Sequence, residues 1–426
     1  MHLETTPHRE TAPRLETAPH LETTPHRETT PHLETAAPLP LVRSSPLDPP
    51  AEYARLRAED PVSRLRMPNG QTGWLLTRYS DVRAVLADPR FSSRNGFVFN
   101  PVRPLTPEAE VLLRQTPGQF IGMDPPEHTR FRRMLTGQFT VRRMRELEPR
   151  IAEIVSSRLD ALAGPPVDLV AAFTLPVPSL VICELLGVPY ADRADFQRRS
   201  RTLLSVTADL AVVLEARQEI RDYITGLVRS KRQHPADDLL SGLARDDTLT
   251  DEELTSVGAL LLVAGHETTA NMLALGTLTL LRRPDRLAQL AADPALLDRA
   301  VEELLRYLTI IQFGLVRLAL ADVPVGGVLV RAGEPVVASL AAANRDPAHF
   351  ADPETLDLAR EYAPHLAFGH GVHQCLGQQL ARTEMRLGFG QLLARFPTLR
   401  LAVPPEDVPM REDTIVYGVG SLPVTW

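Results

Sequence analysis

Cysteine, lysine and aromatic residues are scarce in this chain of 426 residues. Its two cysteines, Cys183 and Cys375, are far apart in the sequence, so we expect no disulfide framework. Cys183 lies in an apolar segment, where a cysteine is expected to be buried and inert. Lys231 is the only lysine among 46 basic residues, a bias that indicates a GC-rich genome rather than a mechanism.

Positive charge and long apolar runs are also lacking. The formal net charge is −7, which argues against a nucleic-acid partner. No apolar run approaches the roughly 18 residues that a membrane helix needs. The N-terminus has no hydrophobic signal region. We therefore expect a cytoplasmic protein that binds neither nucleic acid nor a membrane.

Residues 2–38 form a tandem repeat of the type HLETTP or HRETAP. A proline in every sixth position prevents a continuous helix, and the repeat has almost nothing apolar to bury. The five histidines of the repeat could bind a metal, but a solvated low-complexity tail is the more ordinary interpretation. We expect residues 1–39 to be a disordered tail and residues 40–426 to form one folded domain.

The second cysteine lies in a glycine-rich segment, residues 368–377, which reads Phe-Gly-His-Gly-Val-His-Gln-Cys-Leu-Gly. Gly369 and Gly371 allow a tight backbone, and the residues from Leu376 onward have helical periodicity. Cys375 would therefore lie at a helix N-terminus, where free N–H groups favour a thiolate. Such a thiolate suits a nucleophile or a metal ligand, haem iron included.

Two other interpretations of Cys375 are open at this point. A lone cysteine is most often a small core residue. Alternatively, His365, His370, His373 and Cys375 offer four nitrogen or sulfur donors for zinc within a short span.

A long helix is predicted from a capping box at Thr250 and Glu253 to about residue 283. Residues 257–264 are apolar on nearly all faces, which indicates a buried helix. Its centre, residues 264–269, reads Ala-Gly-His-Glu-Thr-Thr and contradicts helix propensity, as functional segments often do. Thr268 can bond the carbonyl of Ala264, which would loosen the helix and open a groove close to Glu267. A kinked core helix is the alternative.

Further charged residues recur at helical spacing. His128 and Arg132 are four apart, so they share a face that would suit a carboxylate or would merely be solvated. Glu303 and Arg306 are three apart between apolar neighbours, which favours a buried pair that needs further partners. Residues 91–121 are punctuated by proline and glycine and are predicted to be a long loop.

Together these segments resemble the cytochrome P-450 monooxygenases over residues 46–426. The resemblance is carried by the cysteine segment 368–377, the segment 264–269, Glu303 and Arg306 followed by Arg360, and the His128/Arg132 pair, in the family's order. It implies a mainly α, single-domain P-450 fold with small β-sheets and a buried haem b.

The resemblance also assigns roles to residues. Cys375 would be the iron ligand, Thr268 would hydrogen-bond the dioxygen and help to deliver protons, and Glu267 with water would connect that site to solvent. Arg317 and His373 would join His128 and Arg132 around the haem propionates, which gives His373 a role other than zinc binding. The other residues expected to contact the haem are Phe368, Gly369, Gly377, Ala264 and Gly265.

The implied reaction inserts one atom of O2 into a small hydrophobic molecule, a secondary metabolite or a xenobiotic. The chain has no flavin or iron–sulfur motif, so electrons would come from NAD(P)H through a ferredoxin reductase and a ferredoxin. The alternatives are a peroxide-driven or oxidative-coupling haem enzyme, and a non-catalytic haem-binding protein. We expect the protein to be a monomer.

Overall fold

The computed structural model describes residues 36–426 with the exception of 95–99, 105 and 107–115. Ala37 forms a β-bridge with Leu65, and Leu39 is buried in a small cluster beside the first strands. Ordered packing therefore begins a few residues before position 40. The rest of the predicted tail lies outside the described residues, and its disorder stays a prediction.

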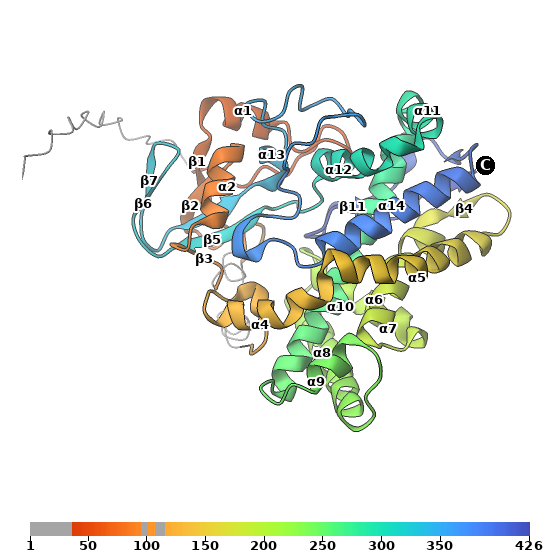
Figure 1. Cartoon of the computed structure of the whole chain (residues 1–426). Helices are drawn as coiled ribbons and strands as arrows, with labels where there is room; N and C mark the ends of the chain where they lie inside the picture. The colour runs from red at the N-terminus through yellow and green to blue at the C-terminus, as the bar shows by residue number, and fades with distance from the viewer. Residues whose placement is uncertain (1–35, 95–99, 105, 107–115) are drawn as a thin grey trace, which may run out of the picture. The chain divides into compact units, whose positions relative to one another are not determined.

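Helices make up most of the described chain (Figure 1). Those that form the main hydrophobic core with their neighbours are α4 (Glu127–Thr136), α5 (Val141–Asp160), α6 (Pro176–Leu186), α7 (Arg193–Leu204), α8 (Leu210–Gln233), α9 (Leu239–Ala244), α10 (Asp251–Leu281), α11 (Pro284–Ala292), α12 (Leu297–Leu308) and α14 (Gln378–Arg395). Shorter helices pack near the largest sheet, namely α1 (Glu52–Glu59), α2 (Tyr79–Ala87) and α13 (Leu340–Ala343).

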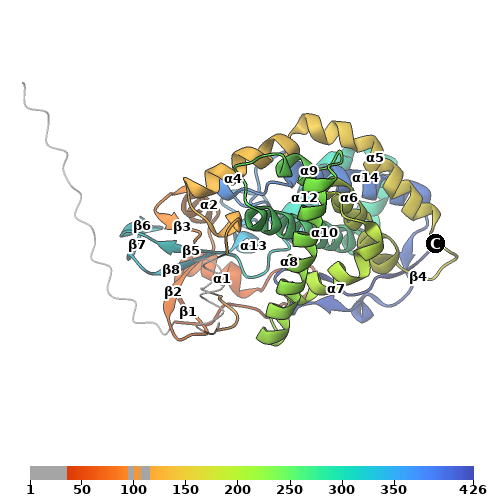
Figure 2. The same cartoon turned by 90° about the horizontal axis from the view of Figure 1, so that it is seen from below.

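The largest sheet has five strands in the order β1-β2-β8-β5-β3, and it lies at the end of the molecule away from α5 and α7 (Figures 1 and 2). These strands are β1 (Val62–Arg66), β2 (Thr72–Leu76), β3 (Phe91–Ser92), β5 (Leu315–Ala319) and β8 (Pro335–Ala338). β2 and β8 are parallel, with Trp74 opposite Val336, and the other pairs are antiparallel. The pairing of β5 with β8 holds Arg317 in a buried strand.

Three small sheets complete the secondary structure. Their strands are β4 (Val167–Asp168), β12 (Pro423–Thr425) and β9 (Arg400–Leu401) in one sheet, β6 (Val323–Val325) with β7 (Val328–Val330) in another, and β10 (Met410–Arg411) with β11 (Gly418–Val419) in the third. β11 packs against α10, so the C-terminal hairpin is held beside the long helix.

Helix α10 lies at the centre of the helical part (Figure 2). Its capping box is present as predicted, because Thr250 Oγ1 accepts from the N–H of Glu253 at 3.1 Å and Glu253 Oε2 accepts from the N–H of Thr250 at 2.9 Å. The helix packs against α6, α8 and α14, which explains why its central residues are apolar on most faces.

The predicted buried ion pair is confirmed. Arg306 donates to both carboxylate oxygens of Glu303 at 2.7 and 2.8 Å, and the exposed fractions of the two side chains are 2% and 3%. Arg360 donates to Glu303 Oε2 at 3.0 Å and completes the cluster. This cluster joins α12 to the segment that precedes the cysteine loop.

One loop prediction is partly wrong. Phe91 and Ser92, at the start of the predicted loop 91–121, form the edge strand β3 against β5. Ser92 and Ser93 both hydrogen-bond the carboxylate of Asp124, which fixes this strand to the chain ahead of α4. Much of the remaining loop falls outside the described residues.

We found no helix in the described part of the chain that is long and apolar enough to cross a membrane.

Candidate functional site

A cavity of about 310 Å³ lies between α10 and the cysteine loop. Cys375 and Thr268, which are 107 positions apart in the sequence (375 − 268), both line it. Most of its other walls are apolar, with Leu260, Leu261, Met272, Ile310, Ile311, Phe120 and Leu380 among them. The cavity therefore combines one thiol and the threonines Thr268 and Thr269 with a mainly hydrophobic surface.

The cysteine loop has the tight backbone that its glycines predict. The N–H of Cys375 donates to the carbonyl of Phe368 at 2.8 Å and closes the loop. Gly369 and Gly371 have φ of +70° and +74°, in the left-handed region that favours glycine. A Cβ at Gly371 would lie 2.4 Å from the carbonyl oxygen of Leu86, so the loop also rests closely on the end of α2.

The helix after the loop begins two residues later than predicted, at Gln378 instead of Leu376. Cys375 therefore precedes the helix and does not begin it. Burial raises the pKa of the Cys375 thiol, against the opposing effects of a backbone hydrogen bond from Gly377 and of the charges of Arg132 and Arg382. The expected preference for thiolate is outweighed in the protein alone, because the free surface of the sulfur faces the cavity rather than bulk water.

The helix α10 is not loosened at its centre, although the sequence predicted that it would be. Thr268 Oγ1 donates to the carbonyl of Ala264 at 2.8 Å as expected, yet the α-helix continues from Asp251 to Leu281 without a break. Packing explains why a glycine stands at position 265 within the helix, since a Cβ there would lie 2.6 Å from Cδ1 of Ile182 in α6. Ala264, Gly265 and Thr268 all line the cavity, as do Phe368, Gly369 and Gly377.

Glu267 does not line this cavity, although the groove beside Thr268 was expected to lie close to it. Its side chain is 1% exposed, and its Oε2 accepts from Nη1 of Arg411 at 2.9 Å. The helix turns by about 100° per residue, so neighbours in sequence point to different faces. Thr268 points into the cavity, and Glu267 points towards the C-terminal hairpin.

Two imidazoles and two guanidinium groups lie together at the edge of the cavity. The rings of His128 and His373 lie 4.1 Å apart, both nitrogens of His128 and Nε2 of His373 are buried, and these atoms have no hydrogen-bond partner among the described residues. Burial lowers the pKa of His128 to about 4 and that of His373 to about 3. Arg132 and Arg317 add to both shifts, so the two guanidinium groups lie close to the imidazoles.

Arg317 does not line the cavity directly, whereas the other three residues do. Burial lowers its pKa to about 10, and the nearby charge of Asp124 opposes that shift. The cluster thus has an excess of cationic and neutral donor groups over acceptors, which suits a ligand with carboxylates.

The four donors considered for zinc do not converge. His365 pairs with Glu302 at 3.1 Å, and the ring of His373 lies against that of His128 at an interplanar angle of 45°. No group of three or more histidine, cysteine, aspartate or glutamate residues in the described chain is arranged to hold a metal ion.

Two residues at the site were not identified from the sequence. Arg411 holds Glu267 from 144 positions away, and no spacing or motif could indicate that contact. Glu384 is buried against the cavity, and burial raises its pKa well above the usual value. A signal for Glu384 was available, because it follows Leu376 and Leu380 at intervals of four on the apolar stripe of its helix.

The Cytochrome P450 family model matches residues 206–424. The chain is 48% identical to cytochrome P450-SU2 of Streptomyces griseolus over 386 residues, which cover 89% of this chain and 94% of that protein. It is 49% identical to nocardicin C N-oxygenase of Nocardia uniformis subsp. tsuyamanensis, with coverage of 88% and 94%.

Solved structures of cytochromes P450 also match this chain. Cytochrome P450 MoxA of Nonomuraea recticatena matches with a TM-score of 0.83 at 47% identity, covering 91% of this chain and 98% of that one. CYP105P1 in complex with filipin I matches with a TM-score of 0.86 at 44% identity, covering 92% and 99%. Because nearly half of the residues are identical over almost the whole length of these proteins, the chain belongs to the cytochrome P450 family of haem-thiolate monooxygenases.

Proposed function

We propose that this cytochrome P450 oxygenates an apolar small molecule in the cavity between Thr268 and Cys375, with Cys375 as the thiolate ligand of the haem iron. The observation that carries the proposal is the shared cavity itself, because the thiol of Cys375 and the hydroxyl of Thr268 both line a single, mainly apolar cavity. Haem b is the cofactor of the family, and the electrons reach it from NAD(P)H through redox partners.

The residues present fit this cofactor. Cys375 presents sulfur to the cavity, and Gly369 and Gly377 beside it have no Cβ that would narrow the space. His128 and His373 have buried ring nitrogens without partners in the described chain, and Arg132 and Arg317 add positive charge close to them. Two propionates would give these donors their missing acceptors.

When bound, the haem supplies the activation of dioxygen and the transfer of one oxygen atom to the substrate. The chain's own residues govern protons and water. Thr268 uses its proton in the bond to Ala264, so the lone pairs of Oγ1 remain free to accept a hydrogen bond in the cavity. We propose that Thr268 and Glu267 pass protons between that cavity and the other face of α10.

The substrate is proposed to be hydrophobic because the cavity walls are. Ile310, Ile311, Phe120 and Ile121 are among the residues that line it. The relatives include proteins named nocardicin C N-oxygenase, vitamin D3 dihydroxylase and pentalenic acid synthase, which are names of varied small-molecule reactions.

We propose a ferredoxin as the immediate electron donor and a monomeric enzyme. A surface hollow between α5 and α14, the helix that follows Cys375, is lined by Arg145, Arg382 and Arg386. Arg145 is exposed, whereas Arg386 pairs with Glu148 at 2.7 Å and Arg382 with Glu302 at 2.6 Å. Because Glu148, Glu302 and Asp298 line the same hollow, the proposed attraction for an acidic partner rests on the exposed Arg145. Charge reversal by Arg145→Glu should slow reduction by ferredoxin, with a weaker effect at high salt.

Two measurements test the proposed site. The reduced carbon-monoxide complex should show the red-shifted band of a thiolate-ligated haem, and Cys375→Ser should abolish it. If Cys375→Ser keeps that band, the ligand assignment is wrong. A spectral binding screen with a panel of hydrophobic metabolites should then identify ligands that displace water from the cavity.

The role of Thr268 is tested by coupling, the amount of product formed per NAD(P)H consumed. Thr268→Ala should lower coupling by about tenfold or more, because the hydroxyl that accepts a hydrogen bond in the cavity and relays protons there is lost. Thr277→Ala is the matched control, since Thr277 makes the same bond to the carbonyl four residues back, at 2.8 Å, but lies outside the cavity. Equal coupling in Thr268→Ala and Thr277→Ala would contradict the proton role.

A further inference from the structure

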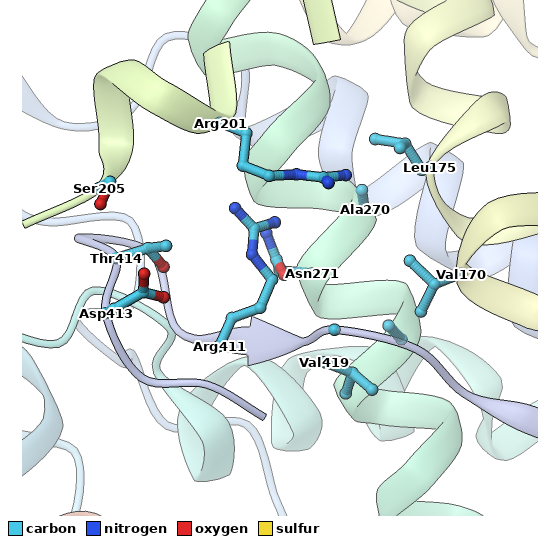
Figure 3. A pocket seen from close by; sticks show the side chains of 12 residues that line it. Val170, Leu175, Arg201, Ser205, Ala270, Asn271, Arg411, Asp413, Thr414 and Val419 are labelled. Atoms are coloured by element: carbon cyan, nitrogen blue, oxygen red, sulfur yellow. The ribbon is translucent and has the colours of Figure 1, made fainter. Parts of the chain in front are cut away.

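A second cavity, of about 200 Å³, lies against another face of α10. Ala270, Asn271 and Ala274 of that helix line it, whereas Thr268 and Met272 line the first cavity. Figure 3 shows the guanidinium groups of Arg201 and Arg411 pointing into it. Arg201, Asp413 and Gly420 are exposed, so this cavity reaches the surface. We call it the outer chamber.

Glu267 belongs to the face of α10 that looks towards the outer chamber. At about 100° per residue it falls in the same sector of the helix as Ala270, Asn271 and Ala274. Arg411, which lines the chamber, donates to Oε2 of Glu267 at 2.9 Å. Asn271 donates to the backbone carbonyl of Glu267 at 2.7 Å. The carboxyl group is therefore held from the chamber side by one of its two oxygens.

The other oxygen has no partner. Oε1 of Glu267 is buried and lies 3.8 Å from Nε2 of His266, which is buried as well, and neither atom has a hydrogen-bond partner among the described residues. His266 Nδ1 lies 2.7 Å from the carbonyl of Leu262, and a carbonyl only accepts, so Nδ1 carries the hydrogen. In the neutral imidazole Nε2 then has a lone pair. Two hydrogen-bond acceptors thus lie 3.8 Å apart in a buried site.

We propose that His266 and Glu267 form a proton-storing pair, in which one proton taken up from the outer chamber is shared between Oε1 and Nε2. A single proton gives both orphaned acceptors a partner, and a small movement of either side chain would bring them within hydrogen-bond distance. Nothing is oxidised or reduced in this step: a solvent acid, hydronium or a buffer ion, gives up the proton in the chamber, the pair gains it, and the conjugate base stays in the solvent. The pair then returns the proton through Glu267 towards Thr268.

The surroundings support a neutral imidazole as the resting form. Burial lowers the pKa of His266, and the charge of Arg411 lowers it further against the opposing effect of Glu267. Phe196 of α7 covers the imidazole edge-on with ring centroids 5.4 Å apart, so no other charged group contributes from that side. His266 is on this basis a positioning residue that acts through Glu267 and does not touch the substrate.

The test uses the haem-loaded protein and three variants at His266 and Phe196. His266→Phe keeps an aromatic ring but removes the acceptor, and His266→Gln can place an amide oxygen near the former Nε2. Phe196→Leu loosens the same packing and leaves both acceptors. We expect coupling to fall about tenfold in His266→Phe, to recover largely in His266→Gln and to be unchanged in Phe196→Leu.

A spectroscopic signal separates this role from a packing role. Infrared difference spectra on carbon-monoxide photolysis should contain the carbonyl stretch of a protonated carboxylic acid that Glu267→Gln removes. In His266→Phe this band should move to higher frequency, because the acid loses its hydrogen-bond acceptor. The pair is ruled out if no band depends on Glu267, or if His266→Phe leaves the band and the coupling unchanged.

The inference rests on the proposed role of Thr268 and Glu267 in proton delivery. The two can fail separately: a protein with the thiolate band and with coupling sensitive to Thr268→Ala, but insensitive to His266→Phe, would retain the proposed function and refute the proton-storing pair.

Discussion

Replacing the buried Glu303 by glutamine should lower the free energy of unfolding far more than the same replacement in an exposed ion pair. Oε1 of Glu303 accepts from Arg306 Nη2 at 2.8 Å and from the N–H of Asp357 at 2.9 Å. Oε2 accepts from Arg306 Nε at 2.7 Å and from Arg360 Nε at 3.0 Å. Every group around the carboxylate is a donor, so the amide NH2 of glutamine faces two donors in either orientation.

The cost follows from these contacts. Two donors lose their acceptor, at least one of them on a guanidinium, and a lost hydrogen bond to a charged group costs about 1.5–3 kcal/mol. The sum, about 3–5 kcal/mol, agrees with the usual cost of removing one partner of a buried ion pair. Unfolding entropies of about 2.1 cal/mol/K per residue give about 0.8 kcal/mol/K for a unit of this size. The melting temperature should therefore fall by about 4–6 °C.

Thermal unfolding followed by circular dichroism measures this shift. Glu52→Gln is the matched control, because Glu52 and Arg55 form an ion pair with the same spacing of three residues on the surface, where the side chains are 45% and 53% exposed. That control should leave the melting temperature unchanged within error. If Glu303→Gln lowers the melting temperature no more than Glu52→Gln does, the buried-charge reasoning is refuted.

Two further predictions concern the cysteine loop and the acid stability of its surroundings. Gly371→Ala should lower both haem retention and the melting temperature, because the added Cβ would lie 2.4 Å from the carbonyl oxygen of Leu86 and φ is +74°. Gly70→Ala is the control: φ is +85° there, but the Cβ would meet no backbone, so only the melting temperature should fall, and by less. Equal losses in the two variants would show that the close contact is unimportant. Hydrogen bonds from His365 and Arg382 outweigh the opposing effect of burial and lower the pKa of Glu302 from 4.5 to about 2. Since the folded pKa is the lower one, this stability is present above pH 4.5 and is lost as the pH falls towards 2, and Glu302→Gln should flatten that part of the urea-midpoint profile.

The sequence determined the features that depend on local spacing. The capping box of α10, the back-bond of Thr268 and the Glu303–Arg306 pair all join residues three or four apart, and helical geometry alone brings such residues together. Gly369 and Gly371 allow the tight backbone that was predicted, since glycine tolerates the positive φ found there, and the motif order was sufficient to indicate the family.

Only the tertiary structure decided which of these residues share a cavity. Thr268 and Glu267 are adjacent in sequence, yet the turn of the helix sends one to the main cavity and the other to Arg411. Packing also explains Gly265, which is small because Ile182 lies against it, and α6 is too far away in sequence for any pattern to show this. The raised pKa of the Cys375 thiol likewise comes from burial, because desolvation depends on everything that surrounds the sulfur and not on the neighbouring helix alone.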